Sequence, residues 1–119
     1  MCCNEEQMNI VTALAGSGPA FVYRFIDALA GGAVKLGLPS ATAAALALNM
    51  VEGAALLAAK STEATDRLAA RVTSPGGTTA AGLDVLDGGD ALAQLVEATL
   101  RAAAERGAEL SKPDSGEKA

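Results

Sequence analysis

Two consecutive segments, 20–36 and 40–60, constrain the fold most strongly, because both are long and almost free of charge. The apolar residues of the first segment recur at steps of three and four, which is the period of an α-helix. Inside the two segments the charged side chains are Arg24, Asp27, Lys35 and Glu52, and Lys60 ends the second segment. A helix that is apolar on most sides is stable only when most of its sides are covered. The two segments therefore predict two buried helices.

The composition fits helices that approach each other closely. Alanine contributes 28 of the 119 residues, half of the residues are apolar, and only 3% are aromatic. Small side chains let helix backbones come close, whereas a β-sandwich needs β-branched and aromatic residues. The sequence contains no alternating strand pattern and no internal repeat. The predicted fold class is all-α, with about five helices in one domain.

Glycine and proline mark where the predicted helices begin and end. Gly18-Pro19 opens the first helix, and Gly37 with Pro39 separates it from the second. The predicted helices are 20–36, 40–60, 63–71, about 79–86, and 91–110. We expect a flexible leader over 1–8, the domain over 9–110 and a disordered tail over 111–119, because the tail has no apolar content.

The charge and the missing residue types exclude several classes of function. The formal net charge is −5, which provides no basic surface for nucleic acid or anionic lipid. The chain has no His, and its only cysteines are the neighbours Cys2 and Cys3. Catalytic triads that need His are excluded, and no metal site is expected. The polar N-terminus lacks a secretory signal and no disulfide framework is present, so we expect a cytoplasmic protein.

Residues 41–59 have nearly the length and the apolar character of a membrane span. Glu52 lies past the midpoint of this stretch, where a charge costs about 2.5–3.5 kcal/mol on insertion, and Asn49 adds to that cost. Alanine side chains contribute little favourable free energy to membrane insertion, so they do not offset this cost. We therefore expect a buried helix of a soluble protein and no membrane contact.

Five helices in 119 residues are too few to cover both apolar segments. A second copy of the chain is the simplest cover, so we expect a homodimer or a higher homo-oligomer. The alternative is a compact monomer with an Ala-rich, weakly amphipathic surface.

Three motifs point to a family. Residues 11–21 read V-T-A-L-A-G-S-G-P-A-F, residues 35–39 read K-L-G-L-P, and residues 71–79 read R-V-T-S-P-G-G-T-T. In this order and at these separations they resemble the C-terminal domain of pyrroline-5-carboxylate reductase, over about residues 5–110. The string V-T-S-P-G-G-T-T is the most specific part. The sequence departs from the family at Ala15, Phe21 and Asn49, where Ser, Tyr and Gln are frequent.

The resemblance implies a bundle-like, all-α dimerisation domain that is intertwined with a second chain and supplies the substrate loop. In the family a separate Rossmann domain binds NAD(P)H, which reduces the cyclic imine 1-pyrroline-5-carboxylate to L-proline in the last step of proline biosynthesis. Here Gly16-Ser17-Gly18 lacks the third glycine of a dinucleotide fingerprint and precedes no βαβ unit. We therefore expect no strong NAD(P)H binding by this chain, which looks like an isolated domain, either engineered or encoded as a truncated reading frame.

Residues 72–79 form the predicted substrate loop. A Pro-Gly-Gly turn before a helix leaves amide donors at Gly77, Thr78 and Thr79, which favour a carboxylate together with the helix dipole. Glycine lets the backbone approach a ligand closely. By resemblance, the substrate-binding residues are Val72, Ser74, Gly76, Gly77, Thr78 and Thr79.

By the same resemblance, Thr79 is the catalytic residue and hydrogen-bonds the ring nitrogen. A threonine hydroxyl is a weak acid, so two roles stay open for it: donating the proton, or only orienting the imine. Ser17 is either a second polar contact or a helix cap, and neither Asp27 nor Glu52 is expected to be catalytic.

The predicted function is that of a substrate-binding, dimerising half of the reductase, without turnover of its own. The alternative is a non-enzymatic helical oligomerisation module derived from the same fold. The preference for NADH or NADPH and any assembly beyond a dimer stay open.

Overall fold

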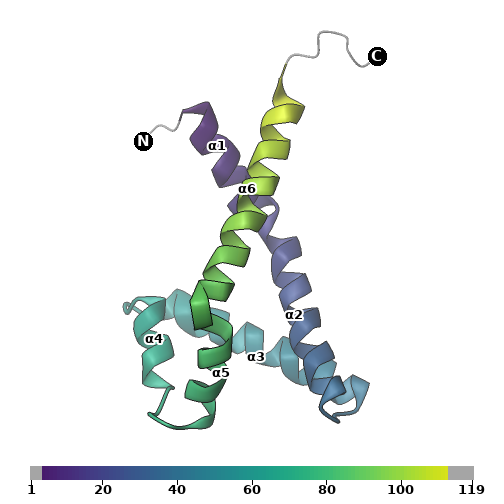
Figure 1. Ribbon diagram of the computed structural model, residues 1–119, viewed down its shortest axis with the longest axis vertical. Coiled ribbons are helices and arrows are strands. Elements are labelled where there is room, and N and C mark those ends of the chain that lie inside the picture. Colours follow the sequence, from purple (N-terminus) through teal and green to yellow (C-terminus); the bar gives the residue numbers. More distant parts are fainter. Residues whose placement is uncertain (1–3, 113–119) are drawn as a thin grey trace. The chain divides into compact units, whose positions relative to one another are not determined.

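The computed structural model describes residues 4–112, which form helices joined by short connections (Figure 1). The α-helices are α1 (Glu5–Val11), α2 (Gly18–Lys35), α3 (Ser40–Lys60), α4 (Thr65–Arg71), α5 (Thr78–Asp87) and α6 (Ala91–Ser111). A π-helical turn, η1 (Thr12–Gly16), follows α1, and a 3-10 turn, η2 (Gly88–Asp90), precedes α6. No strand occurs between residues 4 and 112. The all-α prediction is confirmed, and the five predicted helices are α2 to α6.

Helix α1 lies partly inside the stretch 1–8, for which the sequence predicts a flexible leader, and residues 5–8 of that stretch are helical. Asn4 and Gln7 form a reciprocal capping box. The Gln7 amide donates to Asn4 Oδ1 at 2.7 Å, and the Asn4 amide donates to Gln7 Oε1 at 3.3 Å. Glu5 and Glu6 add negative charge to the first turn, where the helix dipole favours it. Cys2, Cys3 and residues 113–119 of the expected tail lie outside the described residues.

The chain divides into two compact units, with boundaries after Phe21 and after Gly88. The described part of the first unit contains α1, η1, the first residues of α2, and α6. In it α1 and η1 both pack closely against α6, and Ala13 of η1 is only 2% exposed. Small residues thus form the centre of this packing.

The second unit, Val22–Gly88, contains most of α2 together with α3, α4 and α5. The turn from α2 to α3 is a Schellman motif at Gly37, which has a φ of 121°. Here the Leu38 amide donates to the Ala33 carbonyl at 3.1 Å, and the Gly37 amide donates to the Val34 carbonyl at 3.0 Å. The sequence predicts this helix end correctly, because glycine adopts a positive φ without strain.

Helix α3 has one narrow buried strip and broad exposed faces. Ala43 and Ala47, one turn apart, are 2% and 8% exposed, whereas Leu57 is 64% exposed. By length and composition α3 also qualifies as a membrane span, with only 11% of the apolar window buried. The burial that the sequence predicts for this helix is therefore not supplied by the chain itself.

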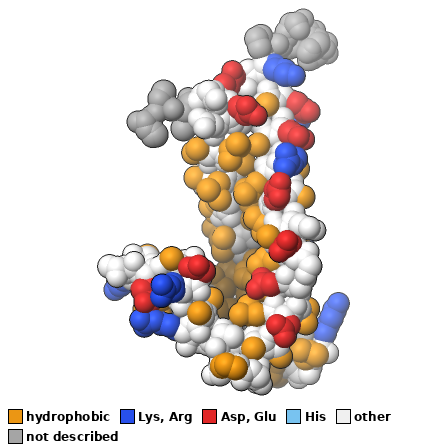
Figure 2. Space-filling view, turned by 60° about the vertical axis from the view of Figure 1, so that its left-hand side comes forward, with side chains coloured by type: hydrophobic (Ala, Val, Ile, Leu, Met, Phe, Trp, Pro, Cys, Tyr) orange, Lys and Arg blue, Asp and Glu red, His pale blue; other side chains and the backbone are white. Residues whose placement is uncertain are grey.

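Close packing between different elements of residues 4–112 is confined, with one minor exception, to α1, η1 and α6. The second unit has only Ala43 and Ala47 as buried residues in its described core. Figure 2 shows hydrophobic side chains open on the surface. The helices of the second unit thus present apolar faces that their own neighbours in the chain leave uncovered.

Candidate functional site

The loop between α4 and α5 begins as a continuation of the last turn of α4. The amides of Val72 and Thr73 donate to the carbonyls of Ala69 and Ala70 at 3.2 and 3.1 Å. The Thr73 hydroxyl donates to the Ala69 carbonyl at 2.6 Å. These bonds satisfy carbonyls at the negative end of α4, which would otherwise repel an anion in the loop.

A tight turn over Ser74-Pro75-Gly76-Gly77 then reverses the chain. The Gly77 amide donates to the Ser74 carbonyl at 3.0 Å, and Gly76 has a φ of 74°. Proline in the second position and a positive φ in the third are typical of a type II turn. A Cβ on Gly77 would lie only 3.3 Å from the Ser74 carbonyl oxygen, so the turn also favours glycine there.

Helix α5 begins directly after this turn, with Gly77 in an extended conformation as its N-cap and no side-chain cap. The amide of Ala81 makes the first helical bond, to the Gly77 carbonyl at 3.1 Å. Among the described residues, the amides of Thr78, Thr79 and Ala80 have no protein acceptor. The sequence prediction is therefore wrong for Gly77, whose amide closes the turn, and it missed the amide of Ala80.

The residues predicted to bind substrate, Val72, Ser74, Gly76, Gly77, Thr78 and Thr79, lie together in this one loop and helix start. Within residues 4–112, no hydrogen bond commits the hydroxyls of Ser74, Thr78 or Thr79. All three residues are exposed, and Val72 is 69% exposed. The loop is an open donor surface with three amides, three hydroxyls and the positive end of a helix dipole.

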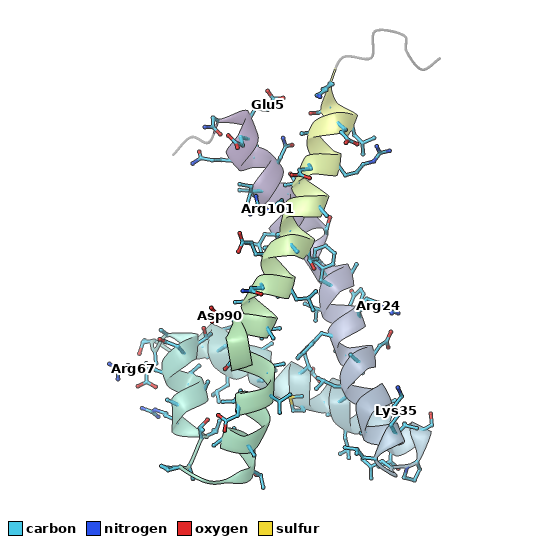
Figure 3. All side chains as sticks on the ribbon, in the orientation of Figure 1. Glu5, Arg24, Lys35, Arg67, Asp90 and Arg101 are labelled. Carbon is cyan, nitrogen blue, oxygen red and sulfur yellow. The ribbon has the colours of Figure 1, made fainter. Side chains whose placement is uncertain are left out.

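Ser17, Asp27 and Glu52 are not joined to the loop by any hydrogen bond or ion pair among the described residues. The amide of Ser17 donates to the Thr12 carbonyl at 3.1 Å, at the end of η1. Asp27 pairs with Arg24 on the exposed side of α2 at 3.7 Å, and the Arg24 side chain extends outward from that helix (Figure 3). Both carboxylates, Asp27 and Glu52, are exposed.

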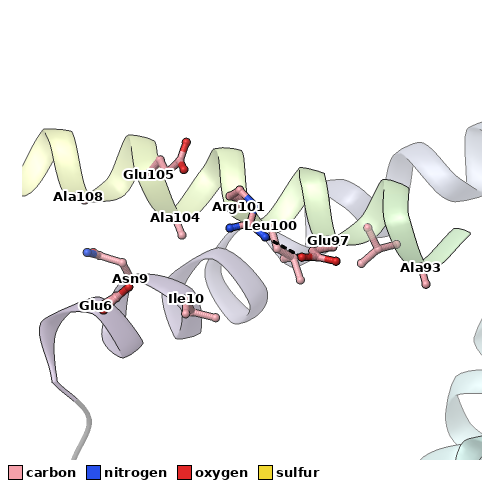
Figure 4. A pocket seen from close by; sticks show the side chains of 11 residues that line it. Glu6, Asn9, Ile10, Ala93, Glu97, Leu100, Arg101, Ala104, Glu105 and Ala108 are labelled. Carbon is pink, nitrogen blue, oxygen red and sulfur yellow. Dashed lines mark hydrogen bonds and ion pairs between the residues drawn. The ribbon is translucent and has the colours of Figure 1, made fainter. Parts of the chain in front are cut away.

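A groove of about 700 Å³ lies in the first unit, between α1 and α6 (Figure 4). Its apolar floor includes Ile10, Val96 and Leu100, and its polar side chains include Glu97 and Arg101, which pair with each other at 2.6 Å. Its other polar side chains are Glu6, Asn9 and Glu105, so the groove carries more acidic than basic groups and disfavours a carboxylate. We therefore take the donor-rich loop, not the larger hollow, as the candidate functional site.

Comparison with known proteins identifies the family. The family described as "Pyrroline-5-carboxylate reductase dimerisation" matches residues 5–110. The pyrroline-5-carboxylate reductase of Synechocystis sp. is 46% identical over 108 residues, which cover 91% of this chain and 40% of that protein.

Two solved structures are also similar to this chain. The structure of a pyrroline-5-carboxylate reductase from Coxiella burnetii aligns with a TM-score of 0.86 and 40% identity, over 94% of this chain and 41% of that one. The Plasmodium falciparum pyrroline carboxylate reductase with NADP bound aligns with a TM-score of 0.80 and 36% identity, over 87% of this chain and 39% of that one.

The fold defines an all-helical domain in which the specific motif forms the turn before α5. The chain belongs to the pyrroline-5-carboxylate reductase dimerisation family. It spans about two-fifths of the length of the relatives that it matches.

Proposed function

We propose that this chain is the substrate-binding and dimerising half of a pyrroline-5-carboxylate reductase. The overall reaction of such an enzyme is the NAD(P)H-dependent reduction of 1-pyrroline-5-carboxylate to L-proline. The observation that carries the proposal is the loop 72–79 with the start of α5, where three uncommitted hydroxyls and two unpaired amides lie within the motif V-T-S-P-G-G-T-T and a third unpaired amide, that of Ala80, follows it directly.

The carboxylate of the substrate binds at the start of α5 in this proposal. The amides of Thr78, Thr79 and Ala80 supply donors without a protein acceptor, and the helix dipole favours a negative charge beside them. Gly76 and Gly77 keep the approach free of side chains, and Gly77 also closes the turn. The exposed side chain of Val72 provides an apolar contact for the ring.

The ring nitrogen is held by the Thr79 hydroxyl, with the Ser74 hydroxyl at the other end of the turn as a second polar contact. Thr79 orients the imine, and the proton comes either from this hydroxyl or from water through it. In a whole reductase, a bound nicotinamide would supply the hydride for the reduction.

The residues of this chain do not fit the dinucleotide itself. A Rossmann cradle needs a strand before its glycine-rich turn, and residues 4–112 contain no strand. NAD(P)H is therefore assigned to the reductase as a whole; the Plasmodium relative has NADP bound.

The proposed partner is a second copy of the chain, in a homodimer or a higher homo-oligomer. The exposed apolar faces of α3 support this proposal, and so does the family's description as a dimerisation domain. We also propose a soluble, cytoplasmic setting, as expected for a biosynthetic reductase.

The second candidate function is a non-enzymatic oligomerisation module. The openness of the loop favours it, because no wall of the described residues encloses a ligand beside Val72.

A titration with L-proline, followed through the amide signals of the ¹⁵N-labelled chain by NMR, separates the two functions. We expect selective shifts at Thr78, Thr79 and Ala80, with an affinity near millimolar, which corresponds to about −4 kcal/mol. The matched control is the start of α6, where Ala91 begins a helix that also lacks a side-chain cap bond. Equal shifts at both helix starts, or none at high proline concentration, would favour the oligomerisation module.

A further inference from the structure

Helix α4, which leads into the loop, is intrinsically weak. It has only seven residues, Thr65–Arg71, and its N-cap, Ala64, provides no side-chain hydrogen bond. Isolated helices of this length are marginal in water. It also lies outside the close packing of α1, η1 and α6. Other interactions must therefore hold its last turn in place.

An ion pair joins the last residue of this helix to the connection that precedes it. Arg71 Nη2 donates to Glu63 Oε2 at 2.9 Å, and the Glu63 amide donates to Ser61 Oγ at 2.9 Å. The Glu63 side chain is 33% exposed, so it is partly shielded from solvent, whereas that of Arg71 is 67% exposed. Because Glu63 lies in the connection before α4 and Arg71 is the last residue of α4, the ion pair spans the whole length of this helix. The positive charge of Arg71 also suits the C-terminal end of the helix.

The position of the loop 72–79 depends on the C-terminal end of α4. Val72 follows Arg71 directly, and the amides of Val72 and Thr73 are bonded back to carbonyls of the last helical turn. The turn closed by Gly77 comes next, and then the amides that we assign to the substrate carboxylate. A change in the position of Arg71 therefore shifts the residues that follow it, which are fixed by the hydrogen bonds of Val72, Thr73 and Gly77, and through them the amides at the start of α5.

We propose that Glu63 and Arg71 are positioning residues, which hold the loop 72–79 in the geometry that binds a carboxylate. This inference rests on the proposed function of the loop. Arg71 is committed to Glu63 and acts through the backbone, not as a direct ligand of the substrate. A direct ligand role predicts the opposite response to the loss of Glu63, because that change would free the guanidinium for the carboxylate.

The test compares Glu63→Gln, Arg71→Gln and the double variant with Arg67→Gln as a matched control. Arg67 lies on the same helix, and its side chain extends away from it (Figure 3). The first readout, without ligand, is hydrogen exchange at the bonded amides of Val72, Thr73 and Gly77. We expect each single variant to speed this exchange about two- to five-fold, the range for an exposed ion pair. The double variant should be no worse than either single one, and Arg67→Gln should have no effect.

The second readout is the affinity for L-proline. We expect Glu63→Gln and Arg71→Gln to weaken the affinity for L-proline by about the same two- to five-fold factor. Arg71→Lys, which keeps the positive charge, should retain most of the affinity of the unmodified chain. Tighter binding by Glu63→Gln would overturn the proposal in favour of a direct ligand role. Unchanged exchange in the loop, or equal acceleration in α6, would overturn it as well. If the unmodified chain binds no proline, the proposed function fails, while the exchange data still decide whether the ion pair orders the loop.

Discussion

At the scale of single residues, backbone groups and side chains have different proposed roles in the candidate site. In the proposed function, the amides at the start of α5 bind the carboxylate and depend little on side-chain identity, whereas the hydroxyl of Thr79 is assigned to the ring nitrogen. The structure changes the role of Gly77, because its amide closes the turn at 3.0 Å and is not available to a ligand. The proposal therefore assigns specificity for an imine or amine over other carboxylates to Thr79.

Replacement of Thr79 by Val tests this division, since valine keeps the β-branched shape and removes only the hydroxyl. We expect the chain to stay folded and to lose about 0.5–1.5 kcal/mol of L-proline affinity, the net value of one hydrogen bond. Affinity for cyclopentanecarboxylate, which has no ring nitrogen, should not change. Parallel NMR titrations of both ligands measure the difference. Equal affinities of Thr79→Val and the unmodified chain for proline would reduce Thr79 to a structural residue.

At the scale of elements, the sequence predicts well where glycine and proline fix the backbone and poorly where distant groups meet. Gly37 ends α2 as predicted, and the five long or turn-bounded helices all appear. Helix α1 was missed because its acidic residues suggest solvent exposure, although Asn4 and Gln7 already form the capping-box pattern. The π-helical turn at Thr12–Gly16 could not be predicted from the spacing of apolar residues.

The candidate site shows the same limit. The motif alone locates the loop and the six residues predicted for it, but it does not reveal which backbone amide bonds within the turn and is therefore unavailable. The Glu63–Arg71 pair is also invisible in the sequence, because an eight-residue spacing exceeds the three- and four-residue spacings of neighbours on a helix. Only the connection before α4 brings the two charges together.

Loss of the Asn4 cap should unravel α1 locally. We expect Asn4→Ala to destabilise this helix by about 0.5–2 kcal/mol, since it removes the acceptor of the Gln7 amide. Asn4→Asp is the matched control, because aspartate caps helices equally well. Hydrogen exchange at the α1 amides measures the effect. The assignment of a stabilising cap would be wrong if both variants exchanged at the same rate as the unmodified chain.

At the scale of the whole molecule, the proposed self-association follows from apolar helix faces that the chain does not cover. Leu46, Met50 and Leu57 of α3 are all at least half exposed, at 56%, 50% and 64%. Obligate interfaces that cover such faces typically bury more than about 2,000 Å². No apolar surface among the described residues covers these side chains.

Sedimentation should therefore find a dimer or a larger oligomer. We expect Leu57→Glu to shift the population toward the monomer, because it places a charge on an apolar face that the partner would desolvate. Arg24→Gln, which alters an exposed charge on α2, is the comparison variant. A folded, stable monomer of 11.8 kDa for the unmodified chain would contradict the proposal.

The purified chain should not oxidise NADH or NADPH in the presence of 1-pyrroline-5-carboxylate. The physical reason is that its described residues contain no strand and hence no dinucleotide cradle. The absorbance of the reduced nicotinamide, followed with and without the chain, provides the measurement. Turnover that depends on the chain and disappears in Thr79→Val would refute this expectation.

The scarcity of packing among α2, α3, α4 and α5 affects how thermal stability must be measured. If these helices bury their apolar faces only against a second copy, then unfolding and dissociation are one event. The chain then has no single melting temperature, because the midpoint rises with protein concentration. Each tenfold dilution removes about 1.4 kcal/mol per dimer from the apparent stability. Variants of this domain can accordingly be ranked by melting temperature only at a common concentration, and a dilute sample will unfold at temperatures where a concentrated one stays folded.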